Sequence, residues 1–396
     1  MRKAIKIKDL GEVITGNTPP RSNPELYGRH TPFIKATDIE ESSKFTYFPE
    51  EFYSEIGFQK YKKSLIRKGA SCVVTIGSVG KKMTMAHCDC FINQAMNAVV
   101  PNNNYDDEYV YYLLKNNIHK LKMLNSGTAS GRENISKSAF SNMEIEAILD
   151  KDKQIIIGKI LSAYDKLIEN NQKQIKLLEE AAQRLYKEWF VDLRFPGCEN
   201  TPIIDGVPEG WKKGILGDIA INVGKKVKKE DRNKYKQYLP IDCLPRKSLA
   251  YTESLNIKLA ESSLVSFKPK DILFGAMRPY FHKVVIAYDK GLTRNTCFVI
   301  NAKEREFLSY LTMLLFSDNT INYATTISVG TTMPYVRLND FLNMEIIIPA
   351  PHIVKEFEKL FKPISEDIVN FAKQIGVLSE ARDRLLTKLM SGEIEV

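Results

Sequence analysis

The chain has 396 residues, too many for one ordinary domain and suited to two domains with connecting elements. Its 57 Lys and Arg exceed its 48 Asp and Glu, which gives a formal net charge of +9 and favours a polyanionic partner without establishing one. No run of about 18 apolar residues occurs, and the start from Met1 to Lys8 lacks the apolar stretch of a signal peptide. We therefore expect a cytoplasmic protein without a membrane span.

The first part of the chain alternates short strand-like runs with turn residues. Residues 72–76 and 97–100 are rich in β-formers and are bounded by Gly, Pro and Asn, and a short helix is expected at 106–116. A long helix is expected at 153–190. The segment 192–211 holds several Pro and Gly residues, which predicts a linker that ends this helix.

The second part follows the same plan. Strand-like runs are expected at 271–274, 283–287 and 297–300, a short helix at 303–316 and a second long helix at 353–390. The order in both parts is therefore strands, a short helix, then a long helix.

Sequence matches show that the two parts are repeats. Asn142-Met143-Glu144-Ile145 recurs as Asn343-Met344-Glu345-Ile346. Further matches follow in the same order at similar shifts: Gln174-Ile175 with Gln374-Ile375, Glu180-Ala181 with Glu380-Ala381, Arg184-Leu185 with Arg384-Leu385, Leu10-Gly11-Glu12-Val13 with Leu216-Gly217-Asp218-Ile219, and Ser64-Leu65 with Ser263-Leu264.

Both long helices carry a heptad pattern. In the first helix, residues of the pattern recur every seven positions, at Leu161, Ile168, Ile175, Ala182 and Trp189, and a second set of positions lies three residues after them. In the second helix, the corresponding residues are Phe361, Ile368, Ile375 and Leu389. Arg382 interrupts the second pattern. Each helix could lie on its own domain, but the narrow seam favours packing of the helices on each other as an antiparallel coiled coil.

We therefore predict a mixed α/β (α+β) fold with an internal pseudo-two-fold repeat. The predicted parts are a first domain at 1–150, a central long helix at 151–191, a linker at 192–213, a second domain at 214–350 and a C-terminal long helix at 351–396. A helix of about 37 residues is about 55 Å long, so domains at its ends would be separated by roughly one to one and a half turns of B-DNA. This arrangement suits recognition of two DNA half-sites that are separated by a spacer whose sequence the protein does not read.

Basic residues are concentrated between Lys212 and Lys236, where nine Lys and Arg residues occur with only three acidic residues. Such a run is usually a solvated face, and phosphate contact by Lys225 and Lys226 is the alternative.

Base reading requires amide, hydroxyl or guanidinium groups on loops. Candidates in the first repeat are Lys35, Thr37, Ser78, Lys81, Lys82, Asn93, Gln94, Thr128, Ser130, Arg132 and Asn134. Candidates in the second repeat are Arg278, Tyr280, Lys283, Arg294, Asn295, Thr331, Thr332, Tyr335 and Arg337. Asn93-Gln94 aligns with Arg294-Asn295, as expected if the repeats read different sequences, although any single candidate could be an ordinary loop residue.

Motifs for catalysis on DNA are absent from the sequence. No Asn/Asp-Pro-Pro-aromatic motif for adenine methylation occurs, and Gly80-Lys81-Lys82 and Gly224-Lys225-Lys226 lack the Ser or Thr of a phosphate loop. His87 lies near Cys88 and Cys90, but without a second pair of ligands a structural role is favoured over a metal site. We expect no catalytic residue, cofactor or metal in this chain.

Several segments resemble a known family over the entire chain. They are residues 10–19 (LGEVITGNTP), 33–39 (FIKATDI), 180–196, 207–219 with its VPEGW start, and 385–392 (LLTKLMSG). Together they resemble the specificity subunits of Type I restriction-modification systems.

The resemblance implies a non-catalytic subunit with two target-recognition domains separated by two antiparallel helices. It further implies two modification subunits that use S-adenosylmethionine to methylate adenine, and two restriction subunits that use ATP and Mg. Tyr186, Trp189, Phe190 and Leu193 are then candidates for partner contact, although burial in the core is favoured for these aromatic side chains. The alternatives are a stand-alone site-specific DNA-binding protein, a nuclease or methyltransferase with a degenerate site, and a scaffold that does not bind DNA.

Overall fold

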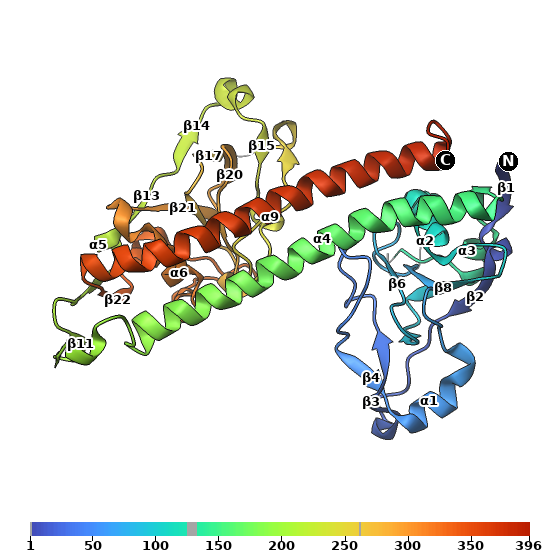
Figure 1. Cartoon of the computed structure of the whole chain (residues 1–396), viewed down its shortest axis with the longest axis horizontal. Coiled ribbons are helices and arrows are strands. Elements are labelled where there is room, and N and C mark those ends of the chain that lie inside the picture. Colours follow the sequence, from blue (N-terminus) through green and yellow to red (C-terminus); the bar gives the residue numbers. More distant parts are fainter. Residues whose placement is uncertain (1, 125–132, 261–262) are drawn as a thin grey trace. The chain divides into compact units, whose positions relative to one another are not determined.

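The computed structural model describes residues 2–124, 133–260 and 263–396. The chain divides into two compact units: unit 1 is Met1–Glu169 with Leu378–Val396, and unit 2 is Asn170–Val377. Two long helices take part in both units. Helix α4 (Lys151–Tyr186) begins in unit 1 and ends in unit 2, whereas α9 (Pro351–Ser391) begins in unit 2 and ends in unit 1 (Figure 1). The predicted domain boundaries stay a prediction.

The described residues of unit 1 form three small sheets and several short helices. The four-stranded sheet is antiparallel, and the three-stranded sheet joins an antiparallel to a parallel pair. The strands, in sheet order, are β2 (Gly11–Thr15), β8 (Met96–Pro101), β5 (Ser71–Val74) and β6 (Met83–Met85); β4 (Glu51–Tyr53), β3 (Tyr27–Ile34) and β7 (Phe91–Ile92); and β1 (Arg2–Lys6) with β9 (Glu144–Ile148). The helices are η1 (Ile7–Asp9), η2 (Pro24–Leu26), α1 (Glu55–Tyr61), η3 (Lys62–Ser64), α2 (Asp107–Asn117), η4 (Ile118–Leu124) and α3 (Lys137–Asn142).

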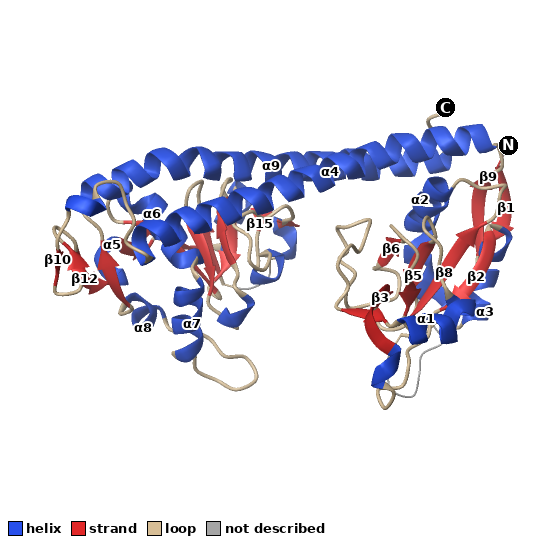
Figure 2. Cartoon of the chain, turned by 60° about the horizontal axis from the view of Figure 1, so that its bottom comes forward, coloured by secondary structure: helices blue, strands red, loops and turns tan. Residues whose placement is uncertain are grey.

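Helix α2 lies at the centre of the unit 1 core. The Asp106 side chain caps its N-terminus by accepting a hydrogen bond from Tyr109 N at 2.9 Å. Every residue from Tyr109 to Leu114 is buried, because α2 lies between the four-stranded sheet and the long helices (Figure 2). A helix that is apolar on all sides requires such cover.

Unit 2 repeats these sheets, and the sheet that has three strands in unit 1 has five strands among the described residues of unit 2. The strands are β13 (Ala220–Asn222), β21 (Cys297–Ala302), β18 (Ile272–Gly275) and β19 (Val284–Ile286); β14 (Lys225–Val227), β17 (Leu264–Phe267), β20 (Gly291–Arg294), β15 (Gln237–Tyr238) and β16 (Leu255–Asn256); β12 (Lys212–Ile215) with β22 (Glu345–Ile348); and β10 (Ile203–Ile204) with β11 (Val207–Pro208). The helices are η5 (Lys187–Val191), η6 (Cys198–Asn200), α5 (Leu216–Ile219), η7 (Lys229–Lys234), η8 (Ile241–Cys243), η9 (Ile257–Leu259), η10 (Pro279–Phe281), η11 (Arg305–Phe307), α6 (Leu308–Phe316), α7 (Asp318–Thr326) and α8 (Leu338–Leu342).

The internal repeat is confirmed, with one constant shift through most of it. Ser71 pairs with Val99 in unit 1 as Ile272 pairs with Ile300 in unit 2. At this same shift, strands β5, β6, β8 and β9 recur as β18, β19, β21 and β22, and α2 and α3 recur as α6 and α8. The predicted mixed α/β fold is therefore correct.

Two of the sequence matches that predicted the repeat were in the wrong register. Ile7 N donates to Met143 O, and Leu216 N donates to Met344 O in the same way, so Leu216 corresponds to Ile7 and not to Leu10. Likewise, Ile66 pairs with Cys90 as Phe267 pairs with Gly291, so Ser64-Leu65 does not correspond to Ser263-Leu264. Chance identity of short peptides therefore produced an incorrect alignment at these two places.

The long helices pack antiparallel within each unit, as predicted. In unit 1, Ile157 and Leu161 of α4 share a core with Leu386 and Leu389 near the end of α9. In unit 2, Asn171 Nδ2 of α4 donates to Gln374 Oε1 at 3.0 Å, and the Trp189 ring lies 5.8 Å from that of Phe357. Residues later in α4 therefore lie beside residues earlier in α9, as in an antiparallel pair.

Arg382 does not interrupt the helix pairing, contrary to the heptad expectation. Its Nη1 lies 2.6 Å from Oδ1 of Asp165, and both side chains are only 8% exposed. The Tyr112 hydroxyl donates to the other carboxylate oxygen. The polar residue is therefore a buried, paired position of the seam.

The aromatic residues at the end of α4 and in the following η5 belong to the unit 2 core. Tyr186, Trp189 and Phe190 are buried, and the Phe190 ring packs against Tyr310 at 4.7 Å. Of the two predictions for these three side chains, burial in the core is therefore confirmed, in preference to contact with a partner. Within the described parts of the chain, no helix combines the length and apolar character that a bilayer crossing requires.

Candidate nucleic-acid interface

Three segments of unit 1 that are far apart in sequence meet through backbone hydrogen bonds. Thr75 N donates to Ala95 O at 2.8 Å, Gly77 N donates to Glu133 O at 2.9 Å, and Ile135 N donates to Thr75 O at 2.9 Å. We call residues 75–78, 93–95 and 133–135 the first cluster. Strand pairing of β5 with β8 brings two of these segments to the same end of the sheet.

Unit 2 contains the same arrangement at the equivalent positions of the repeat. Ala276 N donates to Thr296 O at 2.9 Å, Arg278 N to Pro334 O at 2.7 Å, and Val336 N to Ala276 O at 2.9 Å. We call residues 276–279, 294–296 and 334–336 the second cluster. The two repeats of this chain thus share the backbone hydrogen bonds, whereas the side chains that these bonds position differ.

Four of the residues predicted to bind DNA lie together in the first cluster. Ser78, Asn93 and Asn134 are half-buried, and Gln94 is exposed and accepts a hydrogen bond from the Thr18 hydroxyl. Asn93 Oδ1 is buried without a hydrogen-bond partner among the described residues. Amides in this setting can pair with base edges. Three further candidates, Thr128, Ser130 and Arg132, lie outside the described residues.

The second cluster brings together Arg278, Arg294, Asn295 and Tyr335. Arg294 and Asn295 are exposed, and Arg294 Nε donates to the Tyr238 hydroxyl at 2.7 Å. Tyr335 is 47% exposed. This cluster therefore offers two guanidinium groups, where the first cluster offers amides.

Residues beside the second cluster extend this polar surface. Thr331 and Thr332 are exposed, and Thr332 O accepts a hydrogen bond from Arg278 Nη2 at 3.2 Å. Tyr280 is 49% exposed on η10, and Arg337 is exposed immediately before α8.

The predicted lysines of the loops between β5 and β6 and between β18 and β19 are in different states. Lys81 is exposed and Lys82 is half-buried. Lys283 Nζ donates to Ile241 O at 2.7 Å, and burial lowers the pKa of its ammonium group. Lys81 is thus the lysine of this group that is best placed to meet a phosphate.

Other predicted residues lie outside the two clusters. Lys35 Nζ is held by the carboxylates of Glu50 at 2.6 Å and Glu51 at 3.0 Å, and these contacts raise the pKa of the lysine. Thr37 is exposed in the following turn. Lys225 and Lys226 are exposed on β14, a strand of the same sheet as Arg294.

Two polar residues near the clusters were missed from the sequence. The Thr296 hydroxyl is buried beside the second cluster. Asn97 Nδ2 donates to Thr75 Oγ1 at 2.8 Å, and Asn97 Oδ1 accepts from Thr15 Oγ1 at 2.6 Å, so these groups support the floor of the first cluster. The position of Asn97 in an otherwise apolar strand was the available signal.

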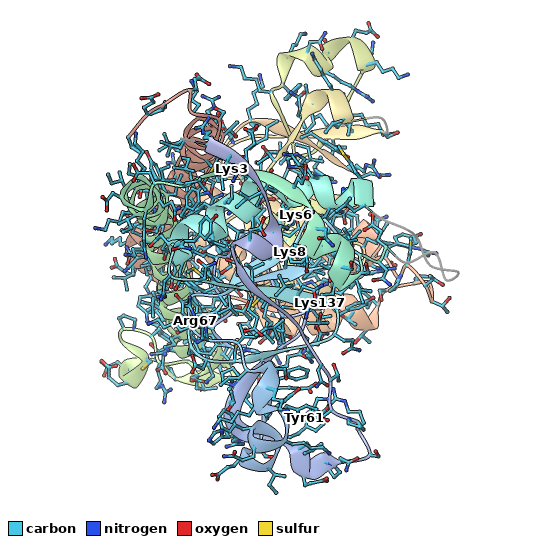
Figure 3. The ribbon with its side chains drawn as sticks, turned by 90° about the vertical axis from the view of Figure 1, so that its right-hand side faces the viewer. Lys3, Lys6, Lys8, Tyr61, Arg67 and Lys137 are labelled. Atoms are coloured by element: carbon cyan, nitrogen blue, oxygen red, sulfur yellow. The ribbon has the colours of Figure 1, made fainter. Side chains whose placement is uncertain are left out.

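Unit 1 also carries lysines outside the first cluster. Figure 3 shows Lys3, Lys6 and Lys8 along β1 and η1, and Lys137 at the start of α3. Two exposed glutamates on β9, one of them directly opposite Lys6, mix the charge of this region. Phosphate contact is therefore less favoured here than at the clusters.

The described residues give no geometry for metal catalysis. Across residues 2–124, 133–260 and 263–396, no three His, Cys, Asp or Glu side chains are grouped to hold a metal ion. His87 Nε2 and Cys88 Sγ are 3.3 Å apart, and burial lowers the pKa of the imidazole and raises the pKa of the thiol. Burial of this kind is typical of a structural pair.

The fold and the paired clusters define a class of proteins that place two related α/β repeats on one pair of long antiparallel helices. A model of the Type I restriction modification DNA specificity domain matches residues 3–180 and 208–375, that is, both repeats. The chain therefore belongs to the family of Type I restriction-modification specificity subunits.

Relatives and a solved structure agree with this assignment. The chain is 29% identical to the Type I restriction enzyme MjaIX specificity subunit of Methanocaldococcus jannaschii, over 99% of this chain and 93% of that one. It is 32% identical to the HindI specificity subunit of Haemophilus influenzae over 44% of this chain and 38% of the relative. The crystal structure of a Type I S subunit from M. genitalium has the same fold, with a TM-score of 0.60 at 16% identity over 98% of this chain and 96% of that one.

Proposed function

We propose that this specificity subunit reads a bipartite DNA site, with the first cluster contacting one half-site and the second cluster the other. The repeated backbone geometry carries the proposal: three equivalent hydrogen bonds hold each cluster, while the exposed side chains differ. Equivalent backbones would approach the two half-sites in the same manner. Different side chains would then select different bases.

The side chains of the clusters suit direct readout of bases. Amides pair with adenine and guanidinium groups with guanine through two hydrogen bonds, and this recognition requires groups held in a fixed orientation. Hydrogen bonds between distant segments provide such rigidity in both clusters. Lys81, Lys225 and Lys226 would add contacts to phosphates, which position the protein without specifying a sequence.

The proposal assigns the chemistry to partner subunits. Two modification subunits would bind S-adenosylmethionine and methylate adenine, and two restriction subunits would bind ATP and Mg. The specificity subunit itself would be non-catalytic and would work in the cytoplasm, where chromosomal DNA is accessible. A stand-alone regulator is less well supported, because relatives that match over nearly their whole length are specificity subunits.

The test is to express the chain with the modification subunit of its own host and to map methylated adenine by single-molecule sequencing. We expect methylation at one split motif, lost when the gene for this chain is deleted. Exchanging residues 1–150 for the corresponding part of another specificity subunit should change one half of the motif. A change in both halves, or unchanged methylation in the deletion strain, would contradict the proposal.

Salt dependence separates this function from that of a scaffold that does not bind DNA. Phosphate contacts make affinity fall steeply as salt rises, because bound counterions are released. A complex that does not bind DNA at about 50 mM salt would identify a scaffold, and binding whose affinity is unchanged between about 50 and about 200 mM, the range over which that release is large, would contradict the phosphate contacts.

A further inference from the structure

Among the positions at which the two clusters differ, one has a left-handed backbone in both. Gly77 and Arg278 both have a positive φ, +89° and +49°, and both donate their backbone N–H to the segment before α3 or α8. The left-handed conformation is readily adopted by glycine and costs other residues about 1–2 kcal/mol. Unit 2 therefore keeps an arginine where unit 1 has the residue that the backbone prefers.

The Arg278 side chain is held but not neutralised. Its Nη2 donates to Thr332 O at 3.2 Å, its Nε is buried without a hydrogen-bond partner, and no ion pair of this guanidinium is found in the described part of the chain. The hydroxyl of Thr296, in the same cluster, is also buried. Strained backbone and unpaired buried polar atoms persist where a ligand completes them.

We infer that Arg278 reads a guanine in the second half-site. This inference rests on the proposed function and deepens it. A guanidinium fork matches the O6 and N7 acceptors of guanine in the major groove, whereas an ammonium group acts as a point charge. At the equivalent position of unit 1, Gly77 presents no side chain, so this position contributes no base contact to the first half-site.

The geometry allows the two residues to be exchanged. A Cβ added at Gly77 would meet no atom within 4 Å, and glycine at position 278 would relieve the left-handed conformation. Arg278→Gly should therefore fold at least as well as the native chain. Any loss of recognition in this variant is then separable from loss of structure.

The experiment uses the complex of the full chain with its modification subunit. Competition between DNA duplexes for binding to the complex is measured. The duplexes carry the motif identified by methylation mapping, or this motif with a single-base change within its second half. Arg278→Gly should reduce the preference for guanine at one position by about 10- to 100-fold and leave the first half unchanged. Arg278→Lys should lose the same preference while it keeps most of the affinity, because a lysine retains the attraction to phosphate.

Two further arms make the assignment specific to guanine. Replacing that guanine by 7-deazaguanine, which lacks the N7 acceptor, should weaken binding of the native complex and have no effect on the Arg278→Gly complex. Gly77→Arg should add a preference for guanine in the first half of the motif. A uniform loss of affinity for all duplexes in Arg278→Gly would identify a phosphate contact only and would overturn the inference.

The inference and the proposed function fail in different ways. If the native complex methylates no split motif, the proposed function is wrong and the inference falls with it. If the native complex methylates a split motif and Arg278→Gly methylates the same motif with the same discrimination, only the inference is wrong.

Discussion

Each unit buries a carboxylate of α4, and the two units stabilise these groups differently. In unit 1, Asp165 forms an ion pair with Arg382 and accepts a hydrogen bond from Tyr112. In unit 2, Glu179 is only 5% exposed and accepts hydrogen bonds from the Ser248 hydroxyl at 2.7 Å and from Leu249 N at 2.6 Å, with no ion pair found for it in the described residues. Two carboxylates buried on one helix are thus stabilised differently, one by an ion pair and the other by hydrogen bonds alone.

The floors of the clusters show a similar difference. In unit 1, the loop after β5 is supported by the polar pair Thr75 and Asn97. The corresponding residues of unit 2 are Ala276 and Phe298, and the Phe298 ring packs near Phe341 at 5.8 Å. Divergence therefore extends beneath the surface, although the cluster hydrogen bonds are the same.

The largest stability effect is expected at the buried ion pair of unit 1. Arg382→Ala should lower the free energy of unfolding by about 3–5 kcal/mol, because it leaves the Asp165 carboxylate buried without its partner. Hydrogen exchange of α2 and α4 measures the loss in unit 1. Arg384→Ala on the same helix removes an exposed ion pair with Glu380 and is the matched control, with little change expected. Equal effects of the two substitutions would contradict the buried pairing.

The helix seam of unit 2 should show the next largest effect. Ile175→Ala should cost about 3 kcal/mol, because Ile175 is buried between the helices, whereas Leu177→Ala should cost little at a side chain that is 59% exposed. Both tryptophans, Trp189 and Trp211, lie in unit 2, so their fluorescence during denaturation reports this unit. If Leu177→Ala proved the more damaging, the seam would be wrongly placed.

Glu179 should make unit 2 sensitive to pH. Burial raises the pKa of its carboxyl from 4.5 to about 7, opposed by the hydrogen bonds from Ser248 and Leu249. The folded state therefore binds this proton more tightly than the unfolded state, and the associated stability, on the order of 3 kcal/mol at most, is lost as pH rises from about 4.5 through 7. Glu179→Gln should flatten that part of the tryptophan-detected profile, and an unaltered slope would show that another group is responsible.

The smallest effects are expected at the left-handed position of the clusters. Gly77→Ala should lower stability by about 1 kcal/mol through backbone strain alone, since its Cβ meets no neighbour. Arg278→Gly should raise stability by a similar amount. Thermal melting of the two variants should move in opposite directions, and shifts of the same sign would show that the positions are not equivalent.

The sequence predicted the features that depend on local pattern. Heptads such as Ile168 and Ile175 revealed the long helices, and repeated peptides such as Asn142-Met143 revealed the two repeats. The neighbourhood of Asn93 and Asn134 depends on pairing between segments that are far apart in the sequence, so the candidates could be named but not grouped. Arg382 was misjudged because a heptad pattern scores each helix alone and does not include a partner such as Asp165.

The exchange of helix ends between the units has a consequence for biosynthesis. Unit 2 is one continuous segment, 170–377, whereas unit 1 needs residues 378–396, including the buried Leu386 and Leu389. The segment Met1–Glu169 therefore leaves the ribosome without the side chains that complete its core, and must remain incompletely packed while unit 2 is made. Domains usually mature in the order in which they are translated. Here we expect the N-terminal unit to mature last, once residues 378–396 have been synthesised and have packed into its core.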